Sequence, residues 1–90
     1  MSAPRVVMYT AIYCGYCRRA RALLDQAGVA HEVKDITVDF AERRRIARET
    51  GHRTVPAIFL DGELLGGHDT LVELLRTGEL ARRLAAPPPA

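Results

Sequence analysis

Two cysteines, the only ones in the chain, lie three positions apart in the stretch Cys14-Gly15-Tyr16-Cys17. The stretch directly follows an apolar run at residues 6–9 and directly precedes a helical pattern at residues 18–27. Two thiols at this spacing, at a junction between a strand and a helix, can close a small disulfide. In a short chain without other cysteines, the pair predicts thiol–disulfide redox chemistry.

Two other interpretations of the cysteine pair are weaker. A structural zinc site needs four ligands, of which the pair supplies two. Three histidines could complete such a site, but they are far from the cysteines in sequence and have no paired spacing; they are His31, His52 and His68. A purely structural disulfide would gain little, because its stabilisation grows with loop length and this loop is nearly the shortest possible. No resident metal is therefore expected.

The length and charge of the chain limit the classes of function. Ninety residues make one domain, which we expect to span residues 1–90 with a core at about 5–84 and a flexible tail at 85–90. A net charge of +2 is too small for a nucleic-acid-binding surface, and no apolar stretch is long enough to span a bilayer. The N-terminus lacks the pattern of a secretory signal peptide. We therefore expect a cytoplasmic protein without nucleic-acid or membrane partners.

Hydrophobic periodicity and turn residues predict an α/β chain. The first strand shows no polar alternation, which indicates a central position in a sheet. The opening strand–helix–strand predicts a parallel pair with a right-handed crossover, and the turn Asp61-Gly62 adds an antiparallel hairpin. The predicted order is strand, helix, strand, helix, strand, strand, at residues 5–10, 18–27, 30–35, 40–50, 57–60 and 63–65, then a helix ending at residue 76 and a short helical stretch at 79–84. A Cys-x-x-Cys at the first strand–helix junction of this order is typical of a thioredoxin-like fold, with a four-stranded mixed sheet flanked by helices.

The helical patterns also predict which side chains face the core. The first helix has an apolar stripe of Ala20, Leu23, Leu24 and Ala27, and the second has an apolar face of Phe40, Ile46 and Ala47. The charge run Arg43-Arg44-Arg45 is expected on the solvated face of that second helix. Asp69 or Thr70 is expected to cap the last helix.

Three motifs, in the right order and spacing, resemble those of the glutaredoxin family. Tyr9-Thr10 followed by Cys14-Gly15-Tyr16-Cys17 resembles the family's Tyr-Thr…Cys-Pro-Tyr-Cys. Arg53-Thr54-Val55-Pro56 resembles its cis-proline loop, and Gly66-Gly67-His68-Asp69-Thr70 resembles its Gly-Gly-Cys-Asp-Asp turn. The resemblance covers residues 6–84 and implies a glutathione-dependent thiol–disulfide oxidoreductase that reduces protein disulfides and glutathione mixed disulfides.

The positions of the two cysteines suggest different roles. Cys14 is the expected nucleophile, since it stands at a helix N-terminus, where free backbone amides and the helix dipole favour a thiolate. Cys17 lies one helical turn inward and is expected to be more buried and to act as the resolving thiol. A cis peptide bond before Pro56 would leave the backbone of Val55 facing Cys14, where it can pair with an extended peptide such as glutathione.

The resemblance implies glutathione as co-substrate and no tightly bound cofactor. Asp69 is expected to bind the ammonium group, the backbone amides of Asp69 and Thr70 the γ-glutamyl carboxylate, and Arg53 the glycine carboxylate. Tyr16 is expected to wall one side of the groove. The predicted glutathione contacts are Tyr16, Arg53, Thr54, Val55, Pro56, Gly67, Asp69 and Thr70. The expected partners are glutathione and disulfide-containing or glutathionylated proteins, and the chain is expected to be a monomer.

Several positions depart from the family pattern. Ala11 stands where glutaredoxins often have a lysine that helps to bind glutathione, and Thr70 replaces the second aspartate of the turn. His68 replaces the cysteine of that turn, and we expect it to have no role beyond the turn. Gly15 stands where dithiol glutaredoxins usually have proline, and in this it is similar to members that hold a [2Fe-2S] cluster between two subunits.

Two alternatives therefore stay open. One is a cluster-binding dimer, in which Cys14 is the protein ligand and glutathione a co-ligand. Cys17 argues against a pure cluster carrier, because such members typically keep only the first cysteine. The other alternative is a redoxin that thioredoxin reductase reduces, which the missing lysine at Ala11 keeps possible.

Overall fold

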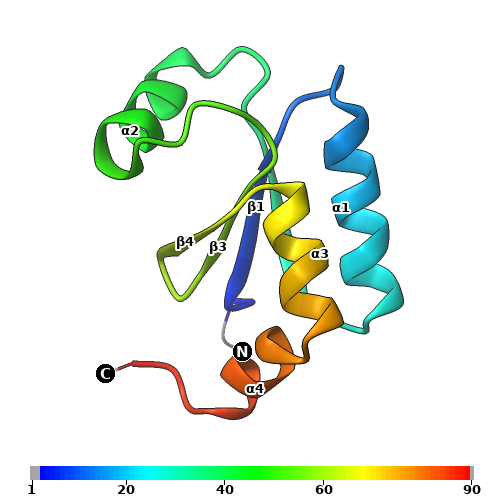
Figure 1. Ribbon diagram of the computed structural model, residues 1–90. Coiled ribbons are helices and arrows are strands. Elements are labelled where there is room, and N and C mark those ends of the chain that lie inside the picture. The colour runs from blue at the N-terminus through cyan, green and yellow to red at the C-terminus, as the bar shows by residue number, and fades with distance from the viewer. Residues whose placement is uncertain (1–2, 90) are drawn as a thin grey trace.

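The central strand of the sheet is β1 (Val6–Thr10), as its unbroken apolar sequence predicts. The computed structural model, which describes residues 3–89, places the strands in the order β2-β1-β3-β4 (Figure 1). β1 runs parallel to β2 (His31–Asp35) and antiparallel to β3 (Ala57–Leu60), and β3 pairs antiparallel with β4 (Glu63–Gly66). The predicted four-stranded mixed sheet is therefore confirmed.

Within the described residues, the faces of the sheet are covered by α1 (Gly15–Gln26), α2 (Phe40–Thr50), α3 (His68–Arg76) and α4 (Glu79–Ala85). Side chains alternate along β1, so Met8 faces one side of the sheet and Tyr9 the other. On the first side, Met8 packs in one core with residues of α1, α3 and α4, which are Ala20, Leu24, Leu71 and Leu80. On the other side, Tyr9 packs with Ile46 of α2. The sheet thus separates α2 from α1 and α3 (Figure 1).

α1 begins at Gly15, three residues before its predicted start, because Cys14 is its N-cap. The earlier start brings Cys17 onto the buried side of the helix, with Ala20 and Leu24. Ala27, which was predicted to be buried, is exposed at the C-terminal end of the helix. Gly28 follows it in the left-handed conformation, with φ 70°, and ends the helix.

The second helix differs from its predicted packing at Phe40. Ile46 is buried, but Phe40 is 60% exposed. The two residues are six positions apart, which at 3.6 residues per turn puts them about 120° apart around the helix. Phe40 is also the first residue of α2, whose N-cap Asp39 accepts a hydrogen bond from the Glu42 amide at 3.1 Å. Phe40 is therefore a surface residue beside the loop that precedes the helix.

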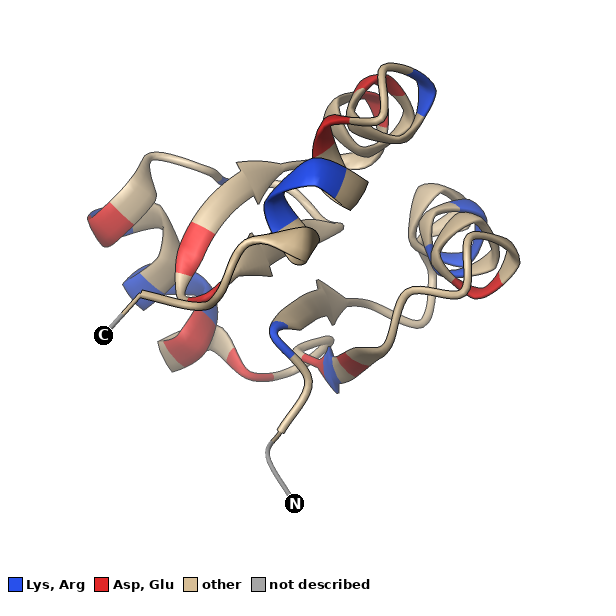
Figure 2. Ribbon diagram, turned by 90° about the horizontal axis from the view of Figure 1, so that it is seen from below, with Lys and Arg blue, Asp and Glu red and all other residues tan. Residues whose placement is uncertain are grey.

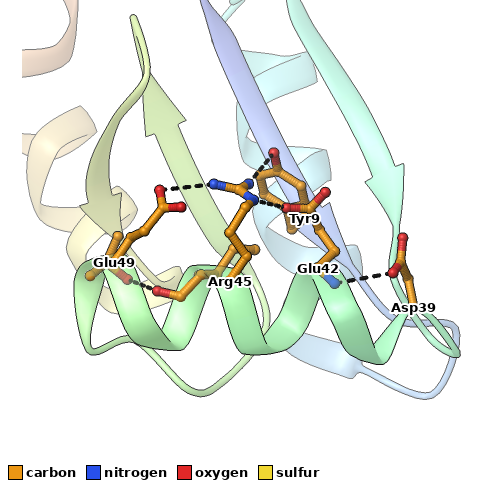
Figure 3. A network of polar contacts seen from close by, with 7 residues as sticks. Tyr9, Asp39, Glu42, Arg45 and Glu49 are labelled. Atoms are coloured by element: carbon orange, nitrogen blue, oxygen red, sulfur yellow. Dashed lines mark hydrogen bonds and ion pairs between the residues drawn. The ribbon is translucent and has the colours of Figure 1, made fainter.

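The three consecutive arginines of α2 do not form one solvated face, contrary to the prediction. Arg45 turns toward the sheet, where it pairs with Glu42 and Glu49 and donates a hydrogen bond to the Tyr9 hydroxyl at 3.4 Å (Figure 3). Arg44 alone is exposed, and Arg43 turns toward Tyr13, the residue before Cys14. The arginines diverge because consecutive residues lie about 100° apart on a helix.

Acidic and basic residues lie on helices on either side of the sheet (Figure 2). Whether a given part of the surface carries net charge therefore depends on which acidic and basic side chains are paired there. Among the described residues, no helix combines the length and the apolar character that a membrane span requires.

Arg5 joins three parts of the chain at one end of the sheet. Its guanidinium makes two hydrogen bonds of 2.9 Å to the Asp61 carboxylate and also donates to the carbonyls of Leu84, at 3.1 Å, and Ala86, at 2.9 Å. Asp61 lies in the turn between β3 and β4, so Arg5 holds this turn and the end of α4 to the start of β1. Residues 87–89 form no helix or strand, and residue 90 of the predicted flexible tail lies outside the described residues.

We expect Asp61→Asn to lower Tm by a few degrees at pH 7. The Arg5 guanidinium holds the pKa of Asp61 below the ordinary carboxyl value. The ion pair therefore stabilises the folded state at neutral pH, and its contribution is lost as pH falls through that lowered pKa. Asparagine tolerates the left-handed backbone at this position, where φ is 52°. Thermal melts between pH 7 and pH 3 should show a deficit that shrinks at the acid end.

Glu63→Gln is the matched control, since it neutralises an exposed carboxylate of the same hairpin. It should leave Tm unchanged at every pH. A deficit for Asp61→Asn that stayed constant with pH would contradict an ion-pair origin.

Candidate active site

Cys14 is positioned by the junction between β1 and α1. Its backbone amide donates to the Ala11 carbonyl at 3.1 Å, which turns the chain out of the strand. Its sulfur accepts a hydrogen bond from the Cys17 amide at 3.2 Å and so caps α1. The first amides of a helix have no intrahelical partner, so they favour negative charge on this sulfur.

The two thiols differ in exposure as predicted. Both are free, but Cys14 is half-buried while Cys17 is only 2% exposed. Burial raises the pKa of the Cys17 thiol, and its hydrogen bond with Cys14 raises the pKa further. Cys17 therefore stays a neutral thiol near pH 7, and Cys14 is the sulfur that a substrate can reach.

The loop before β3 brings a second backbone segment to Cys14. The peptide bond between Val55 and Pro56 is cis, which confirms the prediction from the sequence. The Cys14 thiol donates to the Val55 carbonyl, with 3.4 Å between sulfur and oxygen. The Pro56 carbonyl is 3.2 Å from Nε2 of His52, which links the loop to the end of α2. The backbone of Val55 thus faces the sulfur from the opposite wall.

A cavity of about 470 Å³ lies on one side of this arrangement. A volume of this size suits a small peptide-like ligand. Seven of the eight predicted glutathione contacts line it, together with His68; they are Tyr16, Thr54, Val55, Pro56, Gly67, Asp69 and Thr70. The structure therefore brings together residues of all three motifs, although the first is separated from the other two by more than 35 positions in the sequence.

A second cavity, of about 410 Å³, lies on the other side of Cys14. It shares Tyr16, Thr54 and Val55 with the first cavity, so the two form one groove that passes the sulfur. Arg53, the remaining predicted contact, lines this second cavity instead of the first. Arg43 lies beside it in the same lining.

The helix beyond the Gly66-Gly67 turn starts earlier than predicted. Its N-cap is Gly67, which makes no side-chain cap, so the prediction that Asp69 or Thr70 caps α3 is wrong. Both residues lie in the first turn instead, where their backbone amides have no intrahelical partner and the Asp69 carboxylate is fully exposed. Gly66 has φ 145°, and a Cβ there would lie 2.6 Å from Oγ1 of Thr70. Glycine therefore lets the turn press against the start of α3.

His68 has contacts that the sequence did not predict. Its ring lies 5.3 Å from the ring of Tyr16, and its Nδ1 is 3.1 Å from Oδ1 of Asp69. The histidine thus joins the tyrosine between the two cysteines to the acidic residue of α3. No local pattern indicates this contact, because it depends on how α1 and α3 pack together.

Arg43 is a second residue that the sequence analysis missed. Its guanidinium donates to the Tyr13 hydroxyl at 2.5 Å and to the Ile36 carbonyl at 3.0 Å. Ala11, which replaces the family's lysine, is buried and offers no charge, so Arg43 supplies a cation beside Cys14 from another element. Arg43 lies one turn before the buried Ile46 of α2. This spacing was the signal in the sequence that the Arg43 side chain points away from open solvent.

A metal-binding role depends on how many ligands the described residues can supply. They contain no group of three or more histidine, cysteine or acidic side chains that could hold a metal ion. Cys14 is one accessible sulfur donor, so a cluster would need further ligands from a second copy and from glutathione. A Cβ at Gly15 would lie 3.7 Å from Nη2 of Arg18, so packing does not require glycine there. The cluster-bridged dimer stays an open alternative to the predicted monomer.

Comparison with known proteins agrees with this geometry. The Glutaredoxin family model matches residues 6–65 of the chain. Glutaredoxin 3 of Escherichia coli K12 is 40% identical over 75 residues, which cover 83% of this chain and 90% of that protein.

Two solved structures are similar in fold and sequence. The crystal structure of a buckwheat glutaredoxin–glutathione complex has a TM-score of 0.85 and 33% identity, and the match covers 91% of this chain and 77% of that one. The crystal structure of the holo form of glutaredoxin C1 from Populus tremula x tremuloides has a TM-score of 0.81 and 36% identity, with coverage of 88% and 81%. The chain therefore belongs to the glutaredoxin family, thiol–disulfide oxidoreductases of thioredoxin-like fold.

Proposed function

We propose that this protein uses glutathione to reduce protein disulfides and the mixed disulfides of proteins with glutathione. The observation that carries the proposal is the chemistry of the groove on the two sides of Cys14. One side has the Asp69 carboxylate and the free amides of α3, and the other has the guanidiniums of Arg43 and Arg53. Glutathione has an ammonium and a carboxylate at its γ-glutamyl end and a carboxylate at its glycine end, so its charges complement this arrangement.

The proposed pose of glutathione follows from these charges. Its central cysteine lies beside Cys14, with its backbone paired to that of Val55 as an added strand. The γ-glutamyl carboxylate accepts hydrogen bonds from the amides of Asp69 and Thr70, and the ammonium pairs with the Asp69 carboxylate. The glycine carboxylate lies between Arg53 and Arg43.

The reaction needs two exchanges of sulfur–sulfur bonds. The Cys14 thiolate attacks the glutathione sulfur of a mixed disulfide, so that a bond from Cys14 to glutathione forms while the original bond breaks. The substrate protein leaves as a thiolate, which takes a proton from solvent. A second glutathione thiolate then attacks the glutathione held on Cys14, which releases glutathione disulfide and restores the Cys14 thiolate.

A disulfide within a protein uses Cys17 as well. After Cys14 has joined one sulfur of the substrate, Cys17 gives up its proton and attacks Cys14, which closes a disulfide between the two cysteines and releases the reduced protein. Two glutathione molecules then reduce this disulfide and leave as glutathione disulfide. The buried position of Cys17, behind Cys14 on the same helix, suits this later step.

The difference between the two thiols predicts selective alkylation. Limited iodoacetamide at pH 7 should modify Cys14 alone, because Cys17 is 2% exposed and burial raises its pKa. Peptide mass spectrometry would locate the label. Labelling of Cys17 should appear only above the ordinary thiol pKa of about 8.5, or after unfolding. Equal labelling of both cysteines at pH 7 would contradict the assigned roles.

Serine variants separate the two steps. Cys14→Ser should abolish activity on every substrate, since the nucleophile is lost. Cys17→Ser should keep its activity on a mixed disulfide of glutathione and lose at least about tenfold on a protein disulfide, whose reduction needs the second thiol. Both are measured with NADPH and glutathione reductase. If Cys17→Ser cannot reduce the mixed disulfide, the single-thiol step is wrong.

The same assay tests the reductant. Wild-type protein should turn over with glutathione and glutathione reductase and show little turnover with thioredoxin reductase alone. The reverse result would favour the alternative of a redoxin that thioredoxin reductase serves.

The proposed role of Arg43 is tested with glutamine. Arg43→Gln keeps a side chain that can hydrogen-bond but removes the charge, so we expect KM for glutathione to rise about two- to fivefold with kcat unchanged. Arg44→Gln, at the exposed neighbour, is the matched control and should change neither constant. Equal effects of the two variants would indicate a loss of overall positive charge, against a contact with the glycine carboxylate.

A further inference from the structure

Large apolar side chains are exposed on two loops beside Cys14. Ile12 and Tyr13 lie on the loop before α1, and Val38 and Phe40 lie where β2 leads into α2. Their exposed fractions are 74%, 66%, 78% and 60%. These four residues are here called the apolar rim. Single apolar residues on a surface are ordinary, but a cluster of them next to a reactive sulfur indicates contact with a partner.

Hydrogen bonds hold the two loops of the apolar rim together. The Ile12 amide donates to Oγ1 of Thr37 at 3.0 Å, and the Ile36 amide donates to the Thr10 carbonyl at 2.8 Å. The Asp35 carboxylate in turn accepts from the amide of Thr37 at 2.8 Å and from its hydroxyl at 2.5 Å. The rim is therefore a prearranged surface, which reduces the entropy lost when a partner binds.

The rim is continuous with the groove on one side and with another cavity on the other. Tyr13 lines the cavity of about 410 Å³ that contains Cys14, while Ile12 lines a further cavity of about 340 Å³ between α1 and the edge strand β2. A chain whose cysteine lies at Cys14 can therefore extend over the rim. Glutathione itself is too short to occupy the groove and this surface together.

Arginines flank the rim on both sides. Arg43 and Arg53 lie in the groove, and Arg18 and Arg21 line the further cavity. Within the described part of the chain, none of the four is in an ion pair with a carboxylate. Asp35 lines the further cavity and Asp39 lies between Val38 and Phe40, so two carboxylates stand against these four arginines. The surface around the rim is therefore net positive.

We propose that the apolar rim and these arginines are a docking surface for an extended segment of the substrate protein. The segment carries the disulfide cysteine, has apolar side chains next to it that contact the rim, and has Asp or Glu residues further along that pair with Arg18 and Arg21, the two arginines outside the glutathione groove. Apolar contact with surrounding charge complementarity is the usual construction of a specific interface. The inference rests on the proposed function, because it names the substrate class for the same sulfur.

Synthetic peptides test the charge of the partner. Three substrates are compared in the glutathione-reductase assay: the mixed disulfide of glutathione with 2-mercaptoethanol, and two peptides with a glutathionylated cysteine between leucines, one with flanking glutamates and one with flanking lysines. We expect kcat/KM to be about tenfold higher for the glutamate peptide at low salt, with a ratio that falls as salt rises. Equal values for the two peptides would overturn the proposal.

The double variant Val38→Ser, Phe40→Ser tests the apolar contact. Both side chains are mostly exposed, so Tm should change little. We expect KM for the glutamate peptide to rise about tenfold, because burying an apolar side chain of this size contributes roughly that factor. Activity on the small mixed disulfide should stay within about twofold. Val72→Ser, at an exposed apolar residue of α3, is the matched control and should leave all three substrates unchanged.

The remaining outcomes are distinguishable. Equal losses on the peptide and on the small mixed disulfide, or no loss on either, overturn the docking surface. A wild-type dimer in sedimentation that the double variant abolishes, with no change in peptide KM, also overturns it and assigns the rim to a second copy of the chain. If the wild-type protein reduces none of the three substrates, the proposed function itself fails.

Discussion

The hydrogen bond from the Cys17 amide to the Cys14 sulfur fixes the reactive end of the molecule. Because the sulfur caps α1, it lies where the free amides of the first turn converge. The same sulfur is 3.4 Å from the Val55 carbonyl, so it also sets the distance between α1 and the cis-proline loop. Both walls of the groove are therefore placed relative to one atom, and Cys17 is buried behind it by the turn of the helix.

The charged groups on the two sides of this sulfur differ. The exposed carboxylate of Asp69 and the start of α3 lie on one side, and two guanidiniums lie on the other. A peptide whose charged groups pair with these residues in one orientation would, in the reverse orientation, have the same groups next to residues of like charge. His68, packed on Tyr16 and next to Asp69, joins the first side to the cysteine loop. The groove thus distinguishes the two ends of a ligand by electrostatics as well as by shape.

The sequence was sufficient wherever a local pattern determines the structure. The unbroken apolar run placed β1 in the centre of the sheet, Asp61-Gly62 marked the hairpin, and the Val55-Pro56 bond was correctly expected to be cis. The sequence was insufficient where the structure depends on packing between segments that are far apart in the chain. Phe40 lies off the buried face, and the contacts of Arg43 and His68 come from separate elements meeting at Cys14. The hydrophobic periodicity of one helix does not indicate which residues of other elements that helix contacts.

Arg5 ties the start of β1 to the end of α4, at the end of the sheet opposite the start of α1 (Figure 1). The start of β1 and the end of α4 therefore lie next to each other and far from Cys14, in a molecule whose largest extent is 34 Å. Attaching a fluorescent protein through either end would leave the groove open to solvent.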